Sequence, residues 1–438
     1  MAGPSRKPRS VAMVAALATV AGLALSACTA AVGSGAPVLT WYINPDGGGS
    51  DPTKGGQAQL AKECTDAADG RYSIQIQLLP NSASDQRQQL LRRLAAKDTG
   101  MDLMSMDPVF VAEFAQAGFL APVPAADADT MTKDAVRPAV QASTWRGRLV
   151  AAPMWANTQV LWYRKSVAQA AGLDMNKPVT WDQLIAAAKS QQKTIGVQAR
   201  RYEGYMVWIN ALIEGAGGHI IENPGASADE LRFGLDSPAG QEAAAVIQKV
   251  AQAGVAGPAM GSLDETGALD LFSNDATSGF LVNWPYVWAA LPGKNVDWID
   301  DVGWARYPRT VEGKESRPPF GGIELGVNAA STHQPEAWDA IKCIITPEHQ
   351  TLYMKSTGNP AANKTVYDDP AIRKQFPMAD LIRESLDGGA PRPITQYYGD
   401  VSSAIQRVFS PPDSVDPATT PRQAQDLIES VLKGEALL

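Results

Sequence analysis

The segment at residues 148–164, RLVAAPMWANTQVLWYR, contains two apolar runs separated by a polar triplet. Pro153 interrupts the first run, and a proline there argues against one continuous central strand. The pattern therefore predicts one extended segment that leaves a packed lobe and another that enters a second lobe. Asn157, Thr158 and Gln159 lie at the corner between them. Amides donate and accept hydrogen bonds, as sugar hydroxyls do, although a polar turn within one sheet explains the same residues.

The length and composition fit a two-domain globular protein. The chain has 438 residues, which is more than one hydrophobic core usually holds. Hydrophobic residues make up 45% of the chain and charged residues 19%, an ordinary globular composition with enough apolar material for sizeable cores.

The N-terminus has the pattern of an export signal. Basic residues precede an apolar run at 11–25, which ends in the sequence Leu25-Ser26-Ala27-Cys28. Basic, apolar and small-residue regions in this order are typical of a secretory signal peptide, here 1–27. The run is shorter than the roughly 20 residues that a membrane-spanning helix needs.

The last four residues of that signal resemble a bacterial lipobox. Cleavage there would leave Cys28 as a lipidated N-terminal residue, anchored on the extracellular side of the cell membrane. An ordinary secreted protein with an incidental cysteine is the alternative. Residues 28–37 are rich in small residues and are expected to form a flexible tether.

The charge balance excludes two classes of partner. The formal net charge is −8, and removal of residues 1–27 would take away three basic and no acidic residues, leaving −11. Because no run of lysine or arginine remains, we expect neither nucleic acid nor an anionic membrane surface as a partner.

Two cysteines remain once Cys28 is set aside. Cys64 and Cys343 would lie in an oxidising compartment, which predicts a disulfide between them. Two buried free thiols are the alternative. The bridge would place two distant parts of the chain in one lobe.

Strand-like and helix-like segments alternate between residues 38 and 117, which predicts α/β layers. Apolar residues at period two predict strands, and apolar residues at helical spacing predict helices. The expected strands are 38–43, 71–79 and 101–106, and the expected helices are 57–68, 86–97 with Asp85 as its N-cap, and 109–117.

Polar residues follow each of these strands. Asn44 and Asp46 come after the first strand, Gln86 begins the helix after the second, and Asp107 follows the third. Ligands of α/β sheets bind beyond the carboxyl ends of strands, so these are candidate ligand contacts. Asp107 could instead only cap the helix that follows it.

Three later positions have the properties of a binding site. Trp284 adjoins Pro285 at the end of a strand at 279–282, which suits stacking on a sugar ring, although tryptophan also fills cores. Gly322 begins a strand where a backbone can approach a ligand closely. Arg392 lies between two prolines and is rigidly aimed, or it caps a helix end.

Together these motifs resemble the extracellular sugar-binding proteins of ABC importers, the family 1 solute-binding proteins of maltose-binding type. The resemblance extends from the lipobox to the last helix. More specifically, the sequence is similar to the trehalose-binding lipoproteins of mycobacteria and their relatives. The segments that carry this similarity are SDQRQQLLRRL, SMDPVFVAEFAQAGFL, NTQVLWYR, EGYMVWINALI, NWPYVWA and RPITQYY.

The resemblance implies a periplasmic-binding-protein-like fold of type II, with two α/β lobes, a hinge and a central cleft. We expect residues 38–152 and 300–355 in the first lobe, and 153–299 and 356–438 in the second. The implied function is capture of a disaccharide, trehalose or a close analogue, and delivery to the permease and ATPase of an importer. It implies a monomer that is not an enzyme and needs no cofactor or metal.

The resemblance also points to individual ligand contacts. Asn44 belongs to the first turn, whose sequence INPDGGGSD departs from the family pattern. Thr266, next to Glu265, stands where an acidic residue is expected. The residues that match the ligand contacts of the family by position are Gln86, Asp107, Asn157, Glu203, Trp284, Gly322 and Arg392.

The sequence leaves other classes of function open. A glycoside hydrolase needs two carboxyl groups roughly 5–10 Å apart, and Asp107 with Glu203 or Glu324 could supply them. Ser190 with Lys193 matches an SxxK pattern, but no SDN or KTG accompanies it, and GxSxG, P-loop, GxGxxG and HExxH are absent. A peptide, oligosaccharide or glycerol-phosphate binder on the same fold and a purely structural lipoprotein are further alternatives.

Overall fold

The computed structural model describes residues 35–45 and 49–438. The signal peptide at 1–27, the lipidated Cys28, most of the tether at 28–37 and Asp46 lie outside these residues. Within them, no helix is both long enough and apolar enough to cross a membrane. The two sheets described next lie within one compact unit, Ala36–Leu438.

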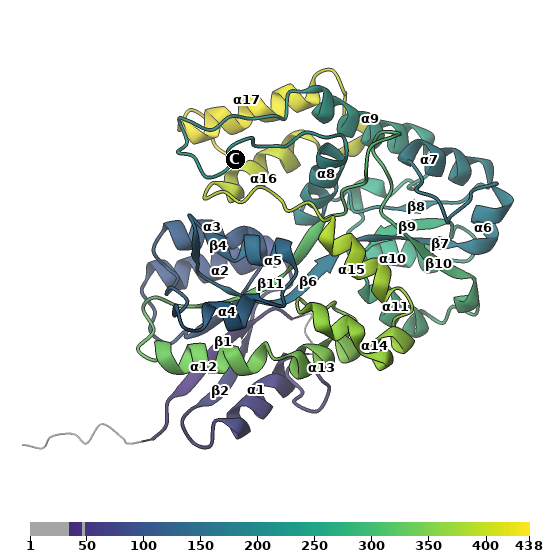
Figure 1. Ribbon diagram of the computed structural model, residues 1–438. Helices are drawn as coiled ribbons and strands as arrows, with labels where there is room; N and C mark the ends of the chain where they lie inside the picture. The colour runs from purple at the N-terminus through teal and green to yellow at the C-terminus, as the bar shows by residue number, and fades with distance from the viewer. Residues whose placement is uncertain (1–34, 46–48) are drawn as a thin grey trace, which may run out of the picture. The chain divides into compact units, whose positions relative to one another are not determined.

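The first sheet has five strands in the order β2-β1-β3-β11-β6 (Figure 1). β1 pairs in parallel with β2 and β3, and β11 pairs antiparallel with β3 and β6. The strands are β1 (Val38–Ile43), β2 (Ser73–Leu78), β3 (Leu103–Met106), β6 (Ala152–Thr158) and β11 (Phe320–Val327). The helices that connect or cover them include α1 (Gln57–Ala67), α2 (Ala83–Ala95), α3 (Val111–Gln116) and α12 (Gln334–Ile344).

The predicted alternation of strands and helices is confirmed, with bounds that differ by up to three residues. The N-cap of α2 also differs from the prediction. Ser82, not Asp85, is the N-cap residue, because its hydroxyl accepts a hydrogen bond from the Asp85 backbone N–H at 3.2 Å. The helix therefore begins at Ala83, and Gln86 lies in its first turn.

The second sheet has four strands in the order β10-β7-β9-β8. They are β7 (Val160–Arg164), β8 (Ile195–Gly196), β9 (Phe280–Asn283) and β10 (Val302–Ala305). The helices α7 (Trp181–Ser190), α8 (Glu203–Gly215), α9 (Pro238–Ala253) and α10 (Glu265–Ser273) precede or follow these strands. α7 begins with a capping box in which Thr180 and Gln183 bond reciprocally.

The chain passes from the first sheet to the second across a single residue, Gln159, between β6 and β7. The two extended segments predicted at 148–164 are confirmed, but Pro153 does not end the first of them. Its partner is Glu324 in β11, where the pairing register shifts next to Ile323, and such an irregularity accommodates a proline.

The sheet boundaries consequently differ from the expected lobe boundaries. β6 keeps the chain in the first sheet up to Thr158, so residues 153–158 do not belong with the second. β10 at Val302–Ala305 pairs with β7, so the chain returns to the first sheet at β11 and not at residue 300.

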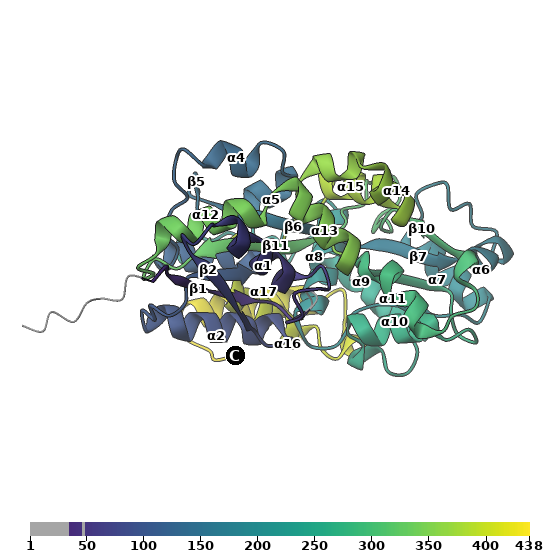
Figure 2. The same cartoon turned by 90° about the horizontal axis from the view of Figure 1, so that it is seen from below.

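The predicted disulfide between Cys64 and Cys343 is confirmed. It joins α1 to α12, and these helices lie together with α13 (Pro347–Thr357) beside the first sheet in two views (Figures 1 and 2). As predicted, the bridge brings an early and a late part of the chain to the same sheet.

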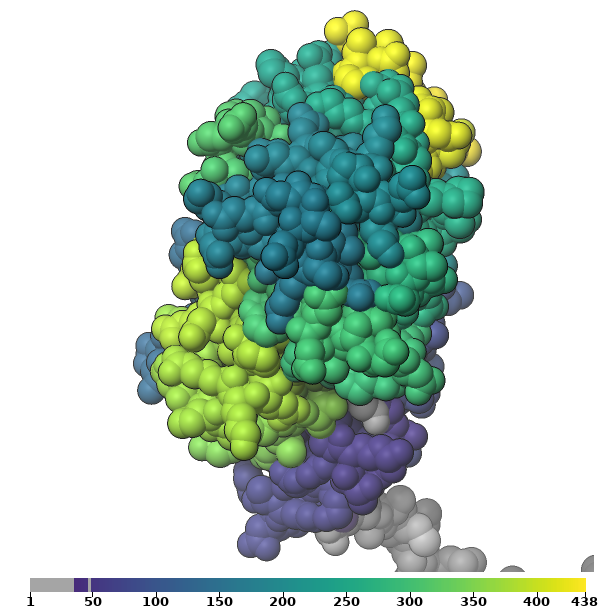
Figure 3. Space-filling model, turned by 90° about the vertical axis from the view of Figure 1, so that its right-hand side faces the viewer, coloured from purple at the N-terminus to yellow at the C-terminus, as the bar shows by residue number. Residues whose placement is uncertain are grey.

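Segments that are distant in sequence also meet on the face shown in Figure 3. Lys165 at the start of α6 (Lys165–Ala170) donates to the Asp300 carbonyl at 2.9 Å. Arg306, just after β10, forms an ion pair with Glu384 of α15 (Ala379–Asp387). The ends of the second sheet are thus held by contacts between segments 135 and 78 residues apart in the sequence.

Candidate functional site

A cavity of about 650 Å³ is lined by residues that come from both sheets. The turn after β1, the start of α2 and the end of β3 contribute from the first sheet, and the ends of β9 and the starts of α8 and α10 contribute from the second. All eight residues predicted as ligand contacts line it: Asn44, Gln86, Asp107, Asn157, Glu203, Trp284, Gly322 and Arg392.

A buried arginine joins two of the predicted carboxylates. Arg392 is 4% exposed, and its Nη2 lies 2.8 Å from Asp107 Oδ1 while its Nη1 lies 2.5 Å from Glu203 Oε1. Asp107 also accepts a hydrogen bond from the Val109 backbone N–H at 3.2 Å. Asp107 therefore caps the short helix at Pro108–Phe110, which confirms the capping role considered for it. It also lines the cavity, where its contact with a ligand stays a prediction.

The charges of this cluster depend on one another. Burial raises the pKa of Glu203, and the nearby Asp107 raises it further, whereas Arg392 lowers it. Burial alone would lower the pKa of Arg392, but the neighbouring Asp107 and Glu203 raise it above its ordinary value. The guanidinium therefore stays charged between its two carboxylates.

Three amide side chains are held in fixed orientations around the cavity. Gln86 Nε2 donates to the Pro80 carbonyl at 2.9 Å, and Asn157 Oδ1 accepts from the Thr158 backbone N–H at 3.0 Å. Asn44 Oδ1 accepts from Gln57 Nε2 at 2.8 Å. Among the described residues, Gln86 Oε1 and Asn157 Nδ2 have no hydrogen-bond partner. An acceptor and a donor thus remain for a polar ligand.

The indole of Trp284 forms an aromatic wall of the cavity. A Cβ on Gly321 would lie 3.1 Å from Trp284 Cη2, so the ring packs over the backbone of β11. The Trp284 backbone N–H donates to Asn283 Oδ1 at 2.9 Å, which fixes the chain where β9 ends. This ring is available for stacking and is held against the strand that also carries Gly322.

Gly322 allows β11 and β6 to approach closely beside the cavity. Its φ is +130°, and a Cβ there would lie 2.2 Å from the Trp155 carbonyl oxygen. Only glycine adopts this conformation readily.

Gly322→Ala is expected to lower the free energy of unfolding by about 3 kcal/mol, because the methyl group meets rigid backbone at a strained φ. Urea denaturation measures the change. The control is Gly293→Ala, whose Cβ would meet nothing within 4 Å. Equal stabilities for the two variants would contradict the role assigned to Gly322.

Several lining residues were not predicted from the sequence. Arg200 pairs with Asp264 at 2.8 Å, and Asp264 also caps α10 by accepting from the Gly267 backbone N–H. Burial raises the pKa of Glu265, and the neighbouring Tyr202 hydroxyl opposes this rise. These residues lie in loops and at helix starts, where no periodic pattern marks them. The only signal is the position of Glu265 beside Thr266, where the family pattern has an acid.

Glu324 does not line the cavity, but it is fully buried in β11 close to Asp107. Its Oε2 accepts a hydrogen bond from the Ser143 hydroxyl. Burial raises the pKa of Glu324 to about 8, with a smaller opposing effect of the Ser143 hydrogen bond and a further rise caused by Asp107. The carboxyl is therefore protonated at neutral pH.

Glu324→Gln is expected to remove a pH dependence of stability. Folding raises the pKa of Glu324 above 4.5, so its contribution is fully present below pH 4.5 and is lost as pH rises towards 8. Relative to wild type, the free energy of unfolding of the variant should gain about 1.4 kcal/mol per pH unit across that window. Urea denaturation at pH 5, 6 and 7 measures the difference, with the exposed Glu312→Gln as control. A difference that does not change with pH would contradict a buried, protonated Glu324.

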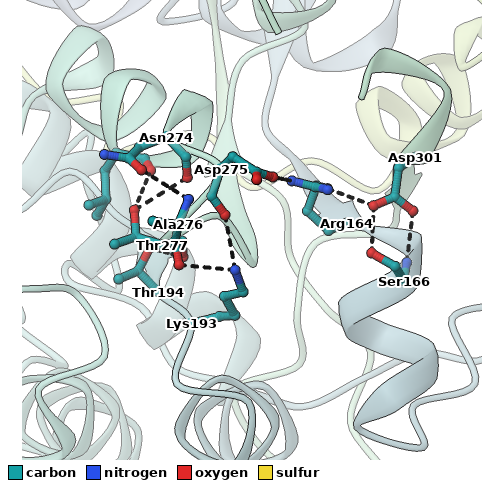
Figure 4. Close-up of polar contacts among 10 residues, drawn as sticks. Arg164, Ser166, Lys193, Thr194, Asn274, Asp275, Ala276, Thr277 and Asp301 are labelled. Atoms are coloured by element: carbon teal, nitrogen blue, oxygen red, sulfur yellow. Dashed lines mark hydrogen bonds and ion pairs between the residues drawn. The ribbon is translucent and has the colours of Figure 1, made fainter. Parts of the chain in front are cut away.

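The SxxK pattern at Ser190 and Lys193 is used structurally. Ser190 Oγ donates to the Ala187 carbonyl at 2.9 Å. The Lys193 amine donates to the carbonyls of Asp275 and Ala276, each at 3.0 Å (Figure 4). Ser190 and Lys193 therefore have separate partners. In the same view Arg164 bridges Asp275, at 2.8 Å, to Asp301 beyond it. These groups fix the turn before β9 and do not form a nucleophile.

Residues 52–351 match the family of bacterial extracellular solute-binding proteins. The chain belongs to this family. The membership places the protein outside the cytoplasm and among solute-binding proteins, not enzymes, as predicted from the sequence.

Curated relatives cover most of the chain. It is 26% identical over 433 residues to a probable ABC transporter-binding protein of Deinococcus radiodurans, an alignment that covers 93% of this chain and 97% of that protein. It is 22% identical over 348 residues to the maltotriose-binding protein of Pyrococcus abyssi, covering 76% and 71% of the two chains.

Solved structures confirm the predicted fold class. The maltose-bound MalE3 of T. maritima superposes with a TM-score of 0.76 at 24% identity, covering 92% of this chain and all of that one. The GacH receptor of Streptomyces glaucescens, solved unliganded and with acarbose, has a TM-score of 0.74 at 17% identity and covers 91% and 98%. At these identities the likeness concerns the fold alone.

Proposed function

We propose that this protein captures a disaccharide, trehalose or a close analogue, in the cavity and delivers it to the permease of an ABC importer. The observation that carries the proposal is the convergence of a carboxylate, two amides and an indole ring on one cavity. Asp107 follows β3, Gln86 lies in α2 and Asn157 lies in β6, all of the first sheet and its helices. Trp284 follows β9 of the second sheet. Relatives named as ABC transporter-binding and maltotriose-binding proteins support the same function.

The contacts match the chemistry of a sugar. Asp107 uses one oxygen for Arg392 and Val109, which leaves its second oxygen to accept a charge-assisted hydrogen bond from a hydroxyl. Gln86 accepts and Asn157 donates further hydrogen bonds. Trp284 covers the less polar face of a sugar ring, so that the site offers both polar and apolar contacts.

The charges favour a neutral ligand over a phosphorylated one. Both lining guanidinium groups are engaged in ion pairs, Arg392 with Asp107 and Glu203, and Arg200 with Asp264. Among the residues that the structure describes, four carboxyl side chains and two guanidinium groups line the cavity. An anion would meet a net negative surface without a free cation, which argues against the glycerol-phosphate alternative.

Closure of two lobes would couple binding to transport. We propose that each lobe is built on one sheet and that the connections after β6 and after β10, with the segment at 391–393, form the hinge. A ligand that contacts both lobes only in the closed state shifts the population towards that state. The permease would then recognise the closed form. Lipid on Cys28 would keep the protein at the outer face of the membrane, as a monomer beside its importer.

A ligand panel tests the proposed function. The chain from residue 38 onward is titrated calorimetrically with trehalose, maltose, maltotriose, sucrose, glucose and glycerol 3-phosphate, and thermal unfolding is followed in parallel. A site-specific sugar at a hundred times its Kd should stabilise the fold by about 2.7 kcal/mol. Binding of trehalose with one site per chain supports the proposal. Stronger binding of maltotriose would reassign the ligand, and the absence of any sugar effect would overturn the proposed function.

Trp284→Ala is expected to weaken binding of the sugar about tenfold to a hundredfold, because the stacking surface for one ring is lost. Calorimetry measures the change. Trp288→Ala is the matched control, since Trp288 packs edge-to-face against Trp304 and donates to the Gln375 carbonyl without lining the cavity. An unchanged affinity of Trp284→Ala would remove this ring from the site.

A further inference from the structure

The carboxylate of Glu203 is surrounded by donors before any ligand arrives. Oε1 lies 2.5 Å from Arg392 Nη1 and also accepts from the Tyr398 hydroxyl. Oε2 accepts from the Ser402 hydroxyl at 2.8 Å. Because both oxygens are occupied, Glu203 is suited to holding Arg392 in place more than to binding a sugar hydroxyl directly.

Two of these donors lie on one face of α16 (Tyr398–Val408). Tyr398 and Ser402 are four residues apart, so their side chains lie one above the other on the helix. Gln406, four residues further on, donates to Ser402 Oγ at 2.8 Å. The three residues are 2%, 3% and 8% exposed, and none of them lines the cavity.

We propose that Tyr398 and Ser402 are positioning residues for the ligand site. Their hydroxyls hold the Glu203 carboxylate, Glu203 holds the Arg392 guanidinium, and Arg392 orients the Asp107 carboxylate that faces the ligand. We call this series of contacts, from Tyr398 and Ser402 through Glu203 and Arg392 to Asp107, the relay. It extends from α16, which packs on α8, to the turn that follows β3 in the first sheet. The effect on sugar affinity rests on the proposed function, whereas the relay itself exists in the ligand-free protein.

The relay works only while Glu203 is ionised. Burial raises the pKa of Glu203, and so does Asp107, while Arg392 and the hydrogen bonds from Tyr398 and Ser402 lower it. Loss of either hydroxyl removes a lowering effect, so Glu203 takes up a proton at a higher pH. A protonated Glu203 no longer balances the charge of Arg392, which then has Asp107 as its only anionic partner.

The experiment compares Tyr398→Phe and Ser402→Ala with wild type in calorimetric titrations with trehalose between pH 5 and 8. Each variant should bind about tenfold more weakly at pH 7, the effect of one hydrogen bond to a charged group. Binding should also be lost at a higher pH than in wild type as the solution is acidified. Ser402→Thr keeps a hydroxyl, so its affinity for trehalose should be close to that of wild type and higher than that of Ser402→Ala. Tyr367→Phe is the control, because Tyr367 is fully buried and donates to the Ala361 carbonyl away from the cavity.

A double-mutant cycle shows whether the hydroxyls act through Glu203. Tyr398→Phe should add no further loss of affinity to Glu203→Gln, since the group that it positions has already changed. Additive losses, or affinities of both α16 variants within twofold of wild type at every pH, would overturn the proposal.

A ligand-free measurement separates this inference from the proposed function. In urea denaturation without sugar, the stability lost in Tyr398→Phe should be larger at pH 7 than at pH 4.5, whereas that lost in Tyr367→Phe should not change with pH. If wild type binds no sugar but this pH difference is present, the proposed function fails and the relay stands. If wild type binds trehalose and the pH difference is absent, only the relay fails.

Discussion

Asp107→Ala is expected to weaken binding of trehalose by a factor of about 30 to several thousand. The substitution removes the carboxylate oxygen that faces the ligand and also one of the two anionic partners of Arg392, which lies 2.8 Å away. Loss of one member of a buried, hydrogen-bonded charge pair costs roughly 2–5 kcal/mol in binding, equivalent to a factor of about 30 to several thousand. Calorimetric titration of the variant measures this loss directly.

Two controls accompany the Asp107 variant. Asp85→Ala removes an exposed carboxylate of α2 that does not line the cavity, and its affinity should equal that of wild type. Asp107→Asn keeps the shape and the helix cap but not the charge, and it should fall between wild type and Asp107→Ala. Binding of Asp107→Ala within threefold of wild type would remove Asp107 from the site.

Arg392→Met is expected to destabilise the protein and to abolish measurable sugar binding. The side chain is 4% exposed and neutralises Asp107 and Glu203, which would be left facing each other without a cation. Breaking a buried ion pair from one side costs about 3–5 kcal/mol. Urea denaturation at pH 7 measures the stability, and calorimetry measures the binding.

Arg422→Met is the matched control for this prediction. Arg422 forms an ion pair with Asp236 at 3.0 Å, but its side chain is 64% exposed. Exposed pairs contribute about 0–1 kcal/mol, so this variant should differ little from wild type. If Arg392→Met lost less than about 1 kcal/mol, the buried cluster would not have the importance assigned to it.

The sequence contained enough information for the fold class because its signals are local. Alternating strands and helices at 38–117 predict α/β layers. The export signal and the cysteine count together predict the bridge between Cys64 and Cys343. The sheet boundaries were harder to predict. Pro153 looked like a strand break, but a shift of register opposite it, at Ile323 and Glu324 of β11, accommodates the ring. Such a feature depends on the partner strand and leaves no mark in the segment itself.

The candidate site likewise contains some residues that a local sequence signal marks and others that only the tertiary fold reveals. Asp107, Trp284 and Arg392 were predicted because each stands next to a proline or a strand end, which fixes its direction. Glu265 and Tyr202 lie at a helix start and in a loop, and only the tertiary fold brings them to the cavity. The contacts of Glu203 with α16 connect residues almost two hundred positions apart, and no spacing rule relates them.

The central claim is that distant segments of this chain form the two sides of one cavity for a neutral disaccharide. A crystal structure of the protein grown with trehalose tests it most directly. We expect one trehalose molecule in the cavity, with a ring against the Trp284 indole and a hydroxyl bonded to the Asp107 carboxylate. A sugar bound elsewhere on the surface, with the cavity filled only by water, would contradict the account.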